Sequence, residues 1–451
     1  MLIKSVSGIR GIVGDGLDPA IILNFAAKFG EFSSSLDKRK NKIIVARDSR
    51  KSGIALKNAV ISGLLGSGVD VIDIDLAPTP TLLYNVKKSN ASGGIIITAS
   101  HNPSEWNALK LVGPSGEFLN KKEAEKFFSL EKERISWKPS KDYGKLEINK
   151  EAVKKHIEGV LATPGIDPDL IKSKKFKVVL DCVNGGASVA FPEFLRTLGI
   201  ETKTVFCDGS GDFKRIPEPR SENLSVLAEK VKESGADIGF ATDPDGDRIS
   251  IVSNEGIPIG EECTVTLAAQ AVLSKNKGPV VVNLSTTKSV EDIANRAGVP
   301  FYRAPVGEAN VVKMMKEKKA IIGGEGNGGV INPEIQYTRD GMGAMAIILQ
   351  YLAECRESVS HIVNSLPRYK MIKEKIKMES DDKGNVFLEK IKNSNKNKEI
   401  NLSDGIRISE DNRWIHIRKS GTEPILRIIA EAPTIDSTQE IIALIKRQGE
   451  K

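Results

Sequence analysis

The segment Ile95-Ile96-Ile97-Thr98-Ala99-Ser100-His101-Asn102-Pro103 changes abruptly from an apolar run to a polar loop. A run of β-branched residues is typical of a strand that is buried on both faces. The small, polar, proline-terminated loop ends this strand and carries Ser100 at its carboxyl end. Because α/β sheets bind ligands beyond the carboxyl ends of their strands, the segment predicts a serine hydroxyl presented to a ligand.

The surrounding chain repeats a strand–helix–strand pattern three times, with a glycine at the end of each helix. The paired strands are expected at 42–46 with 70–74, 176–180 with 202–206, and 279–283 with 300–303, joined by helices at 55–65, 189–198 and 290–296. A further strand follows each unit, at 94–98, 237–241 and 319–322, and runs into an unusual loop. Crossovers of this length join parallel strands. We therefore predict three related α/β domains whose loops point into one cleft.

The C-terminal part of the chain has a different pattern. Strands expected at 414–418 and 426–430 flank the loop Lys419-Ser420-Gly421-Thr422-Glu423-Pro424, and a helix over 437–446 follows. This pattern is typical of a small α+β domain. The predicted fold is therefore three similar α/β domains, with mixed sheets built from βαβ units, and a smaller C-terminal α+β domain around a central cleft. The predicted boundaries are 1–145, 146–255, 256–366 and 367–451.

Composition excludes several classes of protein. The net charge of +7 suits an anionic substrate as well as a nucleic acid, but only 5% of residues are aromatic, which leaves little for base stacking. We expect no nucleic-acid partner. The four cysteines are widely spaced without a C-x-x-C pair, which favours a reduced protein without zinc. No apolar run approaches the ~18 residues of a membrane span, and no export signal is evident, so we expect a cytoplasmic protein with no membrane partner.

The strand expected at 237–241 leads into Asp243-Pro244-Asp245-Gly246-Asp247-Arg248, in which alternate residues carry carboxylates. Two like charges ~4 Å apart repel by about 4 kcal/mol at an effective dielectric near 20, so convergence of the three favours a bound divalent cation. Oxygen-only ligands suit Mg²⁺. An EF-hand would need glycine at Arg248 and glutamate at Asn254. A solvated acidic turn is the alternative, and the apolar strand before the cluster argues against it.

Ser100 is not in a hydrolase elbow, because its surroundings lack G-x-S-x-G. Phosphoryl transfer needs alignment and charge neutralisation more than covalent activation. The cation, together with Arg10, His101 and Lys110, could supply that neutralisation. His101 is interpreted equally well as a general acid or base and as a loop residue that only forms hydrogen bonds.

Two further loops offer groups for a sugar phosphate. Glu325 and Asn327, within a glycine-rich stretch at 324–329, have a carboxylate and an amide suited to sugar hydroxyls. The segment Arg418-Lys419-Ser420-Gly421-Thr422 combines a guanidinium, hydroxyls and glycine amides between two strands. Such a set can bind phosphate. The alternative interpretation is a hairpin turn whose polar side chains bind no ligand.

Taken together, the motifs resemble those of the α-D-phosphohexomutase family, which contains phosphoglucomutases, phosphomannomutases and phosphoglucosamine mutases. The resemblance covers essentially the whole chain, in order, through residues 7–11, 98–103, 243–248, 324–329 and 418–424. It implies that Ser100 carries a phosphoryl group and that the phosphoserine binds Mg²⁺ with Asp243, Asp245 and Asp247. The phosphoryl group would pass to a sugar 1- or 6-phosphate, and the bound 1,6-bisphosphate would reorient before returning a phosphate. A sugar 1,6-bisphosphate is the expected activator.

The resemblance also implies roles for other residues. Arg10 and Lys110 would assist transfer near the serine, and Arg248 would lie beside the metal loop. Glu325 would contact sugar hydroxyls. The other residues expected to bind substrate are Lys288, Arg303, Asn327, Arg418, Ser420, Gly421, Thr422 and Arg427.

The sugar loop departs from the pattern of many relatives, which have serine and then histidine after the glutamate. Here Asn327 and Gly329 occur instead. Such a glycine-and-asparagine loop resembles the variant in some phosphoglucosamine mutases, and this resemblance favours conversion of glucosamine 6-phosphate to glucosamine 1-phosphate. A bifunctional phosphomannomutase/phosphoglucomutase is the alternative within the family. A Mg²⁺-dependent phosphatase and a non-catalytic sugar-phosphate-binding protein are the rivals outside it. Binding alone requires neither Ser100 nor three aspartates, which argues against the last. The expected partner is a phosphosugar, and the chain is expected to be a monomer or homodimer.

Overall fold

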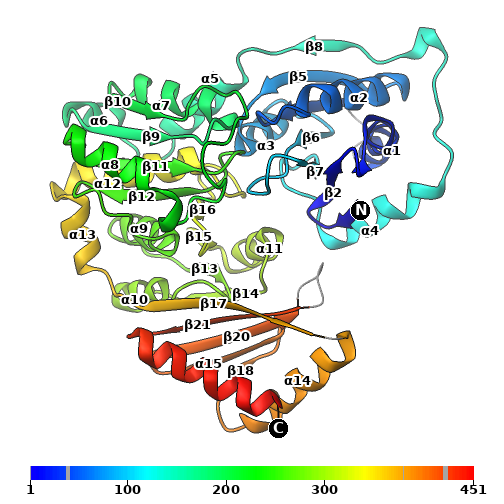
Figure 1. The fold of residues 1–451 in the computed structure, drawn as a ribbon. Coiled ribbons are helices and arrows are strands. Elements are labelled where there is room, and N and C mark those ends of the chain that lie inside the picture. The colour runs from blue at the N-terminus through cyan, green and yellow to red at the C-terminus, as the bar shows by residue number, and fades with distance from the viewer. Residues whose placement is uncertain (1, 37–40, 379, 420–424, 451) are drawn as a thin grey trace. The chain divides into compact units, whose positions relative to one another are not determined.

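The structure is a computed structural model that describes residues 2–36, 41–378, 380–419 and 425–450. The chain forms two compact units, Met1–Thr264 with Gly328–Ile362 and Val265–Asn327 with Val363–Lys451. Figure 1 labels their helices and strands. The segment 256–366, predicted as one domain, contributes to both units.

The first domain is built on an eight-stranded sheet with the order β1-β2-β7-β6-β4-β5-β8 and the short β3 beside β2. The strands are β1 (Leu2–Ser5), β2 (Gly8–Val13), β3 (Gly16–Leu17), β4 (Lys42–Arg47), β5 (Asp70–Leu76), β6 (Gly93–Ile97), β7 (Trp106–Val112) and β8 (Leu146–Ile148). β4 is parallel to both β5 and β6, whereas β6 is antiparallel to β7. The predicted mixed sheet is confirmed.

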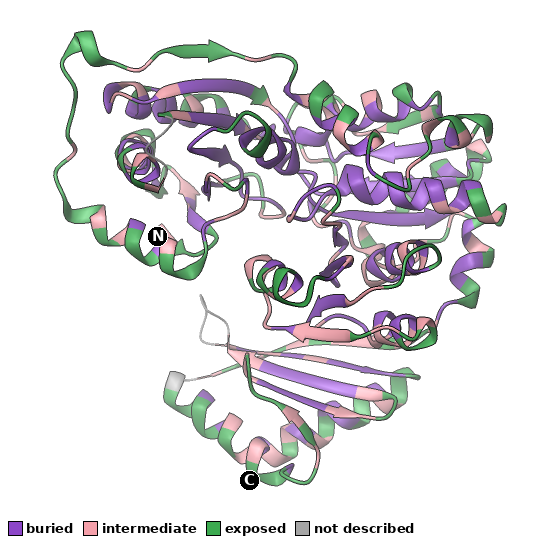
Figure 2. Cartoon of the chain, turned by 180° about the vertical axis from the view of Figure 1, so that it is seen from behind, coloured by how far each residue is buried: buried purple, intermediate pink, exposed green. Residues whose placement is uncertain are grey.

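Both faces of β6 are covered. Ile95 and Ile97 belong to a core cluster with residues of α1 (Pro19–Leu36), α2 (Gly53–Gly66) and α4 (Lys121–Ser129). Ile96 points to the other face and packs with residues of α3 (Thr79–Lys88). Full burial of each such side chain contributes roughly 1.5–3 kcal/mol, which explains the run without alternation and determines where the strand ends. The buried colour of Figure 2 lies mainly in the strands and in the helix sides that face them.

The second domain has a four-stranded sheet with the order β10-β9-β11-β12. Its strands are β9 (Lys177–Asp181), β10 (Glu201–Val205), β11 (Ile238–Thr242) and β12 (Ile249–Ser253), and its helices are α5 (Ala152–Leu161), α6 (Pro168–Ser173), α7 (Phe191–Thr197) and α8 (Ser225–Ser234). The helix expected at 189–198 begins only at Phe191, after a 3₁₀ turn at Gly186–Val189. Pro192 explains the later start, because proline is tolerated in the first turn of a helix but not in its interior.

The remaining elements of the predicted third domain are divided between the units. In the second unit, β13 (Val280–Asn283) pairs in parallel with β14 (Phe301–Ala304) and β15 (Ile322–Glu325), and α10 (Lys288–Ala297) and α11 (Glu308–Lys318) connect these strands. The first unit contains β16 (Gly329–Ile331) and α12 (Gly341–Cys355), and α12 packs on α5 and α6. Helices α9 (Glu261–Leu273) and α13 (Val359–Ser365) include the points where the chain passes between units.

One predicted strand is wrong in position. The strand expected at 319–322 is β15 at Ile322–Glu325, so Gly323, Gly324 and Glu325 belong to the strand and not to a loop. Lys319 has a φ of 52° and closes α11 in the left-handed conformation. A Cβ on Gly323 would lie 2.5 Å from the Val281 carbonyl oxygen. The glycine is therefore required by close packing against β13, although a sequence pattern suggests a flexible loop.

The C-terminal domain is an antiparallel sheet with the order β17-β21-β20-β19-β18. Its elements are β17 (Lys370–Lys377), α14 (Asp381–Ser394), β18 (Glu399–Asn401), β19 (Ile406–Glu410), β20 (Arg413–Lys419), β21 (Ile425–Ala432) and α15 (Ile435–Glu450). Alternate residues of β20 and β21 pack with α14 and α15 in one apolar cluster. The predicted α+β character is confirmed.

None of the four cysteines forms a disulfide. In the part of the chain that the structure describes, no helix is both long enough and apolar enough to cross a membrane.

Candidate active site

Ser100 lies three residues after the end of β6 and is 4% exposed, with a φ of 50°. This left-handed conformation costs a residue with a Cβ about 1–2 kcal/mol, so its surroundings must stabilise it. The Ser100 backbone N–H donates to Thr98 Oγ1 at 2.9 Å, and Thr98 Oγ1 donates to Asp48 Oδ2 at 2.6 Å. The loop therefore has a defined conformation and does not present the serine on a flexible chain.

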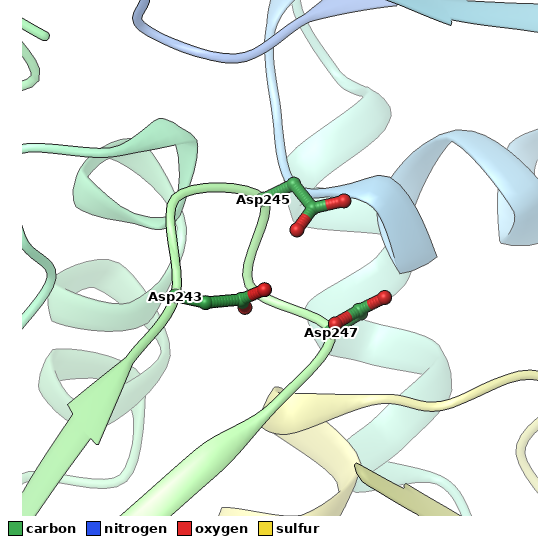
Figure 3. Close-up of side chains that lie close together, drawn as sticks. All are labelled: Asp243, Asp245 and Asp247. Carbon is green, nitrogen blue, oxygen red and sulfur yellow. The ribbon is translucent and has the colours of Figure 1, made fainter. Parts of the chain in front are cut away.

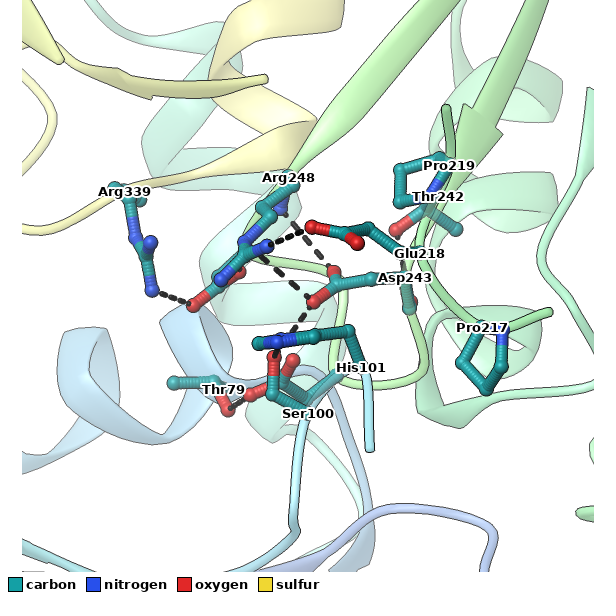
Figure 4. A network of polar contacts seen from close by, with 12 residues as sticks. Thr79, Ser100, His101, Pro217, Glu218, Pro219, Thr242, Asp243, Arg248 and Arg339 are labelled. Carbon is teal, nitrogen blue, oxygen red and sulfur yellow. Dashed lines mark hydrogen bonds and ion pairs between the residues drawn. The ribbon is translucent and has the colours of Figure 1, made fainter. Parts of the chain in front are cut away.

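The hydroxyl of Ser100 meets the aspartate loop of the second domain. Ser100 Oγ donates to Asp243 Oδ2 at 2.8 Å and lies 3.4 Å from His101 Nδ1, as Figure 4 shows. Ser100 and His101 come from the loop after β6, and Asp243 comes from the loop between β11 and β12. Both loops lie at carboxyl ends of strands. The predicted meeting of the serine and aspartate motifs is observed within the first unit.

The three aspartates project from one tight loop (Figure 3). Asp243, Asp245 and Asp247 are each 0% exposed, and one carboxylate oxygen from each lies within 4.8 Å of the other two. Asp245 Oδ1 and Asp247 Oδ1 are buried without a hydrogen-bond partner. Buried carboxylate oxygens that lack donors are costly, and a divalent cation would satisfy them. The oxygen-only set fits Mg²⁺.

Cationic side chains surround this loop. Lys110 Nζ is 2.5 Å from Asp245 Oδ2, and Arg339 Nη2 is 2.6 Å from Asp247 Oδ2. Arg248 Nε lies 3.6 Å from Asp247 Oδ1 and 3.9 Å from Asp243 Oδ2. These charges offset part of the carboxylate repulsion and would also attract a phosphoryl group.

The pKa values of the carboxyl groups diverge because their neighbours differ. Burial, followed by the charges of Asp247 and Asp245, raises the pKa of Asp243 well above its ordinary value. Burial also acts to raise the pKa of Asp245, but the charge of Lys110 and the hydrogen bonds from Asp243, Lys110 and Thr79 together outweigh it, and the pKa of Asp245 is lowered. Without a metal ion, the proton that the loop retains most readily therefore belongs to Asp243.

Arg10 and His101 lie at the loop that carries Ser100. Arg10 Nη1 donates to Asn102 Oδ1 at 2.8 Å. Burial, and then the positive charges of Arg248 and Arg10, lower the pKa of His101 to about 2. His101 is therefore neutral beside Ser100 at ordinary pH, and its role as acid, base or hydrogen-bonding residue stays a prediction.

In the second unit, Glu325 is the last residue of β15 and is 4% exposed. Its Oε1 accepts from Asn283 Nδ2 at 2.8 Å and from the Gly307 backbone N–H at 3.2 Å. Asn327 follows two residues later and is partly exposed. The carboxylate is thus oriented by the end of β13 and by the start of α11.

Arg418 and Arg427 lie opposite each other on the neighbouring strands β20 and β21. The Nε atom of each is buried without a hydrogen-bond partner, and burial lowers the pKa of Arg418. Two adjacent guanidinium groups with unused donors suit an anion. The predicted residues Ser420, Gly421 and Thr422 lie outside the described residues.

Lys288 and Arg303 bind groups of the protein itself. Lys288 pairs with Asp292. Arg303 Nη2 is 3.0 Å from Glu291 Oε2, and its Nη1 donates to the Thr286 carbonyl at 2.7 Å. Both line a polar pocket of about 660 Å³ in the second unit. Their role in substrate binding stays a prediction.

The sequence interpretation missed three residues at this site. Thr79 Oγ1 donates to Asp245 Oδ2 at 2.7 Å, and Arg339 contacts Asp247. Arg50 lies under the serine loop and donates to the Ser100 carbonyl at 2.6 Å. Arg50 had a usable signal, because it follows β4 at the carboxyl end of that strand. Thr79 had the same signal, because it follows the carboxyl end of β5. Arg339 lies before α12 and had no comparable signal.

Comparison with known proteins agrees with this geometry. Four models of phosphoglucomutase/phosphomannomutase domains match the chain: alpha/beta/alpha domains I, II and III at residues 1–133, 154–256 and 260–369, and the C-terminal domain at 374–448. A phosphoglucomutase/phosphomannomutase of Thermococcus kodakarensis is 38% identical and covers 97% of this chain and 96% of its own. A probable phosphoglucosamine mutase of Methanopyrus kandleri is 32% identical and covers 96% and 95%. The solved phosphoglucomutase/phosphomannomutase family protein of Burkholderia thailandensis has a TM-score of 0.85 at 25% identity and covers 99% and 97%.

A buried serine that faces a carboxylate cluster, surrounded by lysine and arginine, is suited to phosphoryl transfer. With the four domain matches and a relative of 38% identity over nearly the whole chain, the protein belongs to the phosphoglucomutase/phosphomannomutase family of phosphohexomutases. The predicted fold class, three α/β domains with a C-terminal domain, is confirmed, as is the enzyme class of mutase. The arrangement of these domains around a central cleft stays a prediction.

Proposed function

We propose that this enzyme moves a phosphoryl group between the 6- and 1-positions of a hexose phosphate, with Ser100 as the carrier. The observation that carries the proposal is the 2.8 Å contact of Ser100 Oγ with Asp243. It places the hydroxyl against buried carboxylates, two oxygens of which lack a donor. Mg²⁺ bound by Asp243, Asp245, Asp247 and the serine phosphate would neutralise charge on the transferred group.

The chain's own residues account for the rest of the transfer. The bond between phosphorus and Ser100 Oγ breaks while a bond forms to the free hydroxyl of the sugar phosphate. The proton of that hydroxyl leaves, and Ser100 Oγ recovers one when transfer is complete. Lys110, Arg10 and Arg248 would stabilise the negative charge on the phosphoryl oxygens during the transfer. In the return step, the other phosphate of the 1,6-bisphosphate is transferred to Ser100 Oγ.

Residues of the second unit are proposed to bind the rest of the substrate. The Glu325 carboxylate, oriented by Asn283 and Gly307, suits sugar hydroxyls. Arg418 and Arg427, with their buried unpaired Nε atoms, suit the phosphate that does not react. Ser420, Gly421 and Thr422 complete this proposed phosphate site, and Lys288, Arg303 and Asn327 are further proposed substrate contacts.

We propose glucosamine phosphate as the preferred substrate. Asn327 and Gly329 follow Glu325 in the sugar loop, and the Methanopyrus kandleri relative is named a probable phosphoglucosamine mutase. A bifunctional phosphomannomutase/phosphoglucomutase is the second candidate, and the more similar Thermococcus kodakarensis relative favours it by its name. The two candidate enzymes share every step of the proposed transfer. Their substrates differ only at the second carbon of the sugar, in the substituent or its configuration.

The deciding experiment is one panel of kcat/KM values for glucosamine, glucose and mannose 1-phosphates, with Mg²⁺ and a trace of the matching 1,6-bisphosphate. A tenfold lead for glucosamine, about 1.4 kcal/mol of transition-state discrimination, supports the amino-sugar assignment. A lead for glucose or mannose overturns the sugar but not the transfer. Release of inorganic phosphate without isomerised sugar, or full activity in Ser100→Ala, overturns the transfer itself.

The remaining proposals concern the setting of the enzyme. We propose domain boundaries at 1–145, 146–255, 256–366 and 367–451, a cytoplasmic location, and a monomer or homodimer that binds phosphosugars and no nucleic acid. The 1,6-bisphosphate is proposed as an activator because it can phosphorylate Ser100 before the first turnover.

A further inference from the structure

Arg50 is a fully buried arginine at the carboxyl end of β4, with a side chain that is 0% exposed. It follows Asp48, whose Oδ2 accepts from Arg50 Nε at 3.0 Å and whose Oδ1 accepts from the Arg50 backbone N–H at 2.9 Å. Neither residue touches the hydroxyl of Ser100. Burial of an arginine is costly unless all its donors are used, so its partners show what it does.

The other hydrogen-bond acceptors of the Arg50 side chain are main-chain carbonyls between Ser100 and Trp106, the first residue of β7. Its Nη2 donates to the carbonyl oxygens of Ser100 at 2.6 Å and Asn102 at 2.7 Å. Its Nη1 donates to the carbonyls of Pro103 and Trp106, the latter at 3.1 Å. A guanidinium has five N–H donors in a rigid plane, and here each has an acceptor. Four of the five bind main-chain carbonyls of the serine loop and of the first residue of β7.

These carbonyls need an outside donor because the loop has left the sheet. Ser100 has left-handed backbone geometry, with a φ of 50°, which prevents it from continuing the ladder of β6. Thr98 braces the other side of the same residue, since its hydroxyl accepts from the Ser100 N–H and donates to Asp48. Asp48, Arg50 and Thr98 therefore form one hydrogen-bond network that fixes the backbone conformation of Ser100.

Residues of the second domain cover this network. The ring of Phe213 lies over the Arg50 guanidinium, 5.0 Å from its carbon, a distance at which cation–π attraction operates. A Cβ on Gly211 would lie 2.0 Å from the Ser49 carbonyl oxygen, so only glycine permits this close approach. The guanidinium is thereby shielded from water beneath the loop.

We propose that Arg50 is a positioning residue for phosphoryl transfer, which fixes the serine loop so that Ser100 Oγ faces Asp243. This inference rests on the proposed role of Ser100 as the phosphoryl carrier. A displacement of about 1 Å at a reacting atom can reduce a rate by about 100-fold. An ammonium has three donors and no plane, so Arg50→Lys keeps the charge but cannot bind all four carbonyls in this geometry.

The first test compares Arg50→Lys with Arg47→Lys in the full-length protein. Arg47 is the last residue of the same strand and is a mostly buried arginine paired with Asp75 at 2.9 Å, so it controls for loss of a guanidinium. Glucose 1,6-bisphosphate with Mg²⁺ supplies the phosphoryl group. The readouts are the single-turnover rate of Ser100 phosphorylation by intact-protein mass spectrometry, steady-state kcat and KM, and thermal melting by circular dichroism.

We expect Arg50→Lys to slow phosphorylation and kcat by about 100-fold with KM within about threefold, at a temperature where the variant is folded. Arg47→Lys is expected to stay within about twofold of the wild-type protein. A phosphorylation rate of Arg50→Lys within about threefold of wild type, or a loss explained by its unfolded fraction, would overturn the inference.

A second pair of variants decides the question if Arg50→Lys does not fold. Thr98→Val removes the hydroxyl with little change in shape, and Thr98→Ser retains it. We expect a large loss of kcat in the valine variant and near wild-type kcat in the serine variant. Equal activity of the two overturns the network. A wild-type protein that never acquires phosphoserine overturns the proposed function and this inference with it, whereas a phosphorylated wild type with unaffected variants overturns the inference alone.

Discussion

Asp243 and Asp245 are two residues apart and equally buried, yet their pKa values shift in opposite directions. Lys110 lies 2.5 Å from Asp245, whereas Asp243 has Ser100 as its short contact. The carboxyl group that meets the nucleophile is therefore the one that holds a proton most readily when no cation is bound. Metal binding and protonation compete at this residue.

We expect the affinity for Mg²⁺ to fall as the pH is lowered, because ligation requires the ionised carboxylate and the pKa of Asp243 is raised. Isothermal titration calorimetry between pH 5 and pH 8, in buffers with different ionisation enthalpies, measures both the affinity and the protons released. Asp243→Asn, which cannot titrate there, serves as the control for this pH dependence. An affinity independent of pH in the wild-type protein would contradict the assignment.

Replacement of Lys110 by Met should destabilise the metal-free protein. It leaves Asp245 buried without its cation, and removing one partner of a buried ion pair costs about 3–5 kcal/mol. Saturating Mg²⁺ should restore part of this loss, because a ligand at 100 times its Kd stabilises by about 2.7 kcal/mol. Urea unfolding with Mg²⁺ and with EDTA measures both effects. A variant as stable as wild type in EDTA is the outcome that disproves the argument.

At the scale of elements, the strands expected from the sequence lie within one or two residues of observed strands, because apolar runs and turn residues act locally. The antiparallel strands β7 and β12 and the C-terminal strands β17, β18 and β19 were not expected. The exception among the expected strands is β15, where Gly323 and Gly324 suggested a loop. Gly323 lets β13 and α11 approach this strand closely, which no local pattern reveals. Glu325 consequently stands at the rigid end of a strand.

Gly323→Ala should lower the free energy of unfolding by about 1–3 kcal/mol, since its Cβ would meet the Val281 carbonyl oxygen at 2.5 Å and Met315 Sδ at 2.6 Å. Gly384→Ala is the matched control. Gly384 lies in α14, where a Cβ meets nothing closer than 3.7 Å, and alanine should stabilise the helix by about 0.5–1 kcal/mol. Chemical denaturation of both variants tests the contrast. Equal effects of the same sign would refute the packing explanation.

At the scale of the whole molecule, buried histidines join segments distant in sequence within each unit. In the first unit, His156 Nδ1 lies 2.9 Å from Thr81 Oγ1 and its Nε2 lies 2.9 Å from Asp340 Oδ2, linking α3, α5 and the residue before α12. In the second unit, His416 Nδ1 lies 2.8 Å from Ser285 Oγ and its Nε2 lies 2.6 Å from the Asp404 carbonyl oxygen.

His416 should make the second unit sensitive to acid. Burial lowers its pKa to about 4 from 6.5, so the neutral ring is favoured. Its Nε2 donates to the Asp404 carbonyl oxygen. The contribution is fully present above pH 6.5 and is lost as the pH falls towards 4, by roughly 3 kcal/mol in total. Unfolding measured at pH 7 and pH 4.5 should show a steeper decline in wild type than in His416→Gln. Parallel declines would show that His416 is not the sensor.

The sequence by itself determined the ends of the expected strands other than β15, the serine loop, the aspartate loop and the family resemblance. Each of these depends on neighbours in the chain, through side-chain periodicity, turn preference and the spacing of carboxylates. Only the tertiary structure decided that Arg50 lies beneath Ser100, that Arg339 contacts Asp247 and that β15 includes Glu325. These contacts join segments that are 50 and 92 residues apart in the first two cases. Long-range packing selects such partners by burial and shape, and local residue patterns carry no information about which distant segment will fill the space.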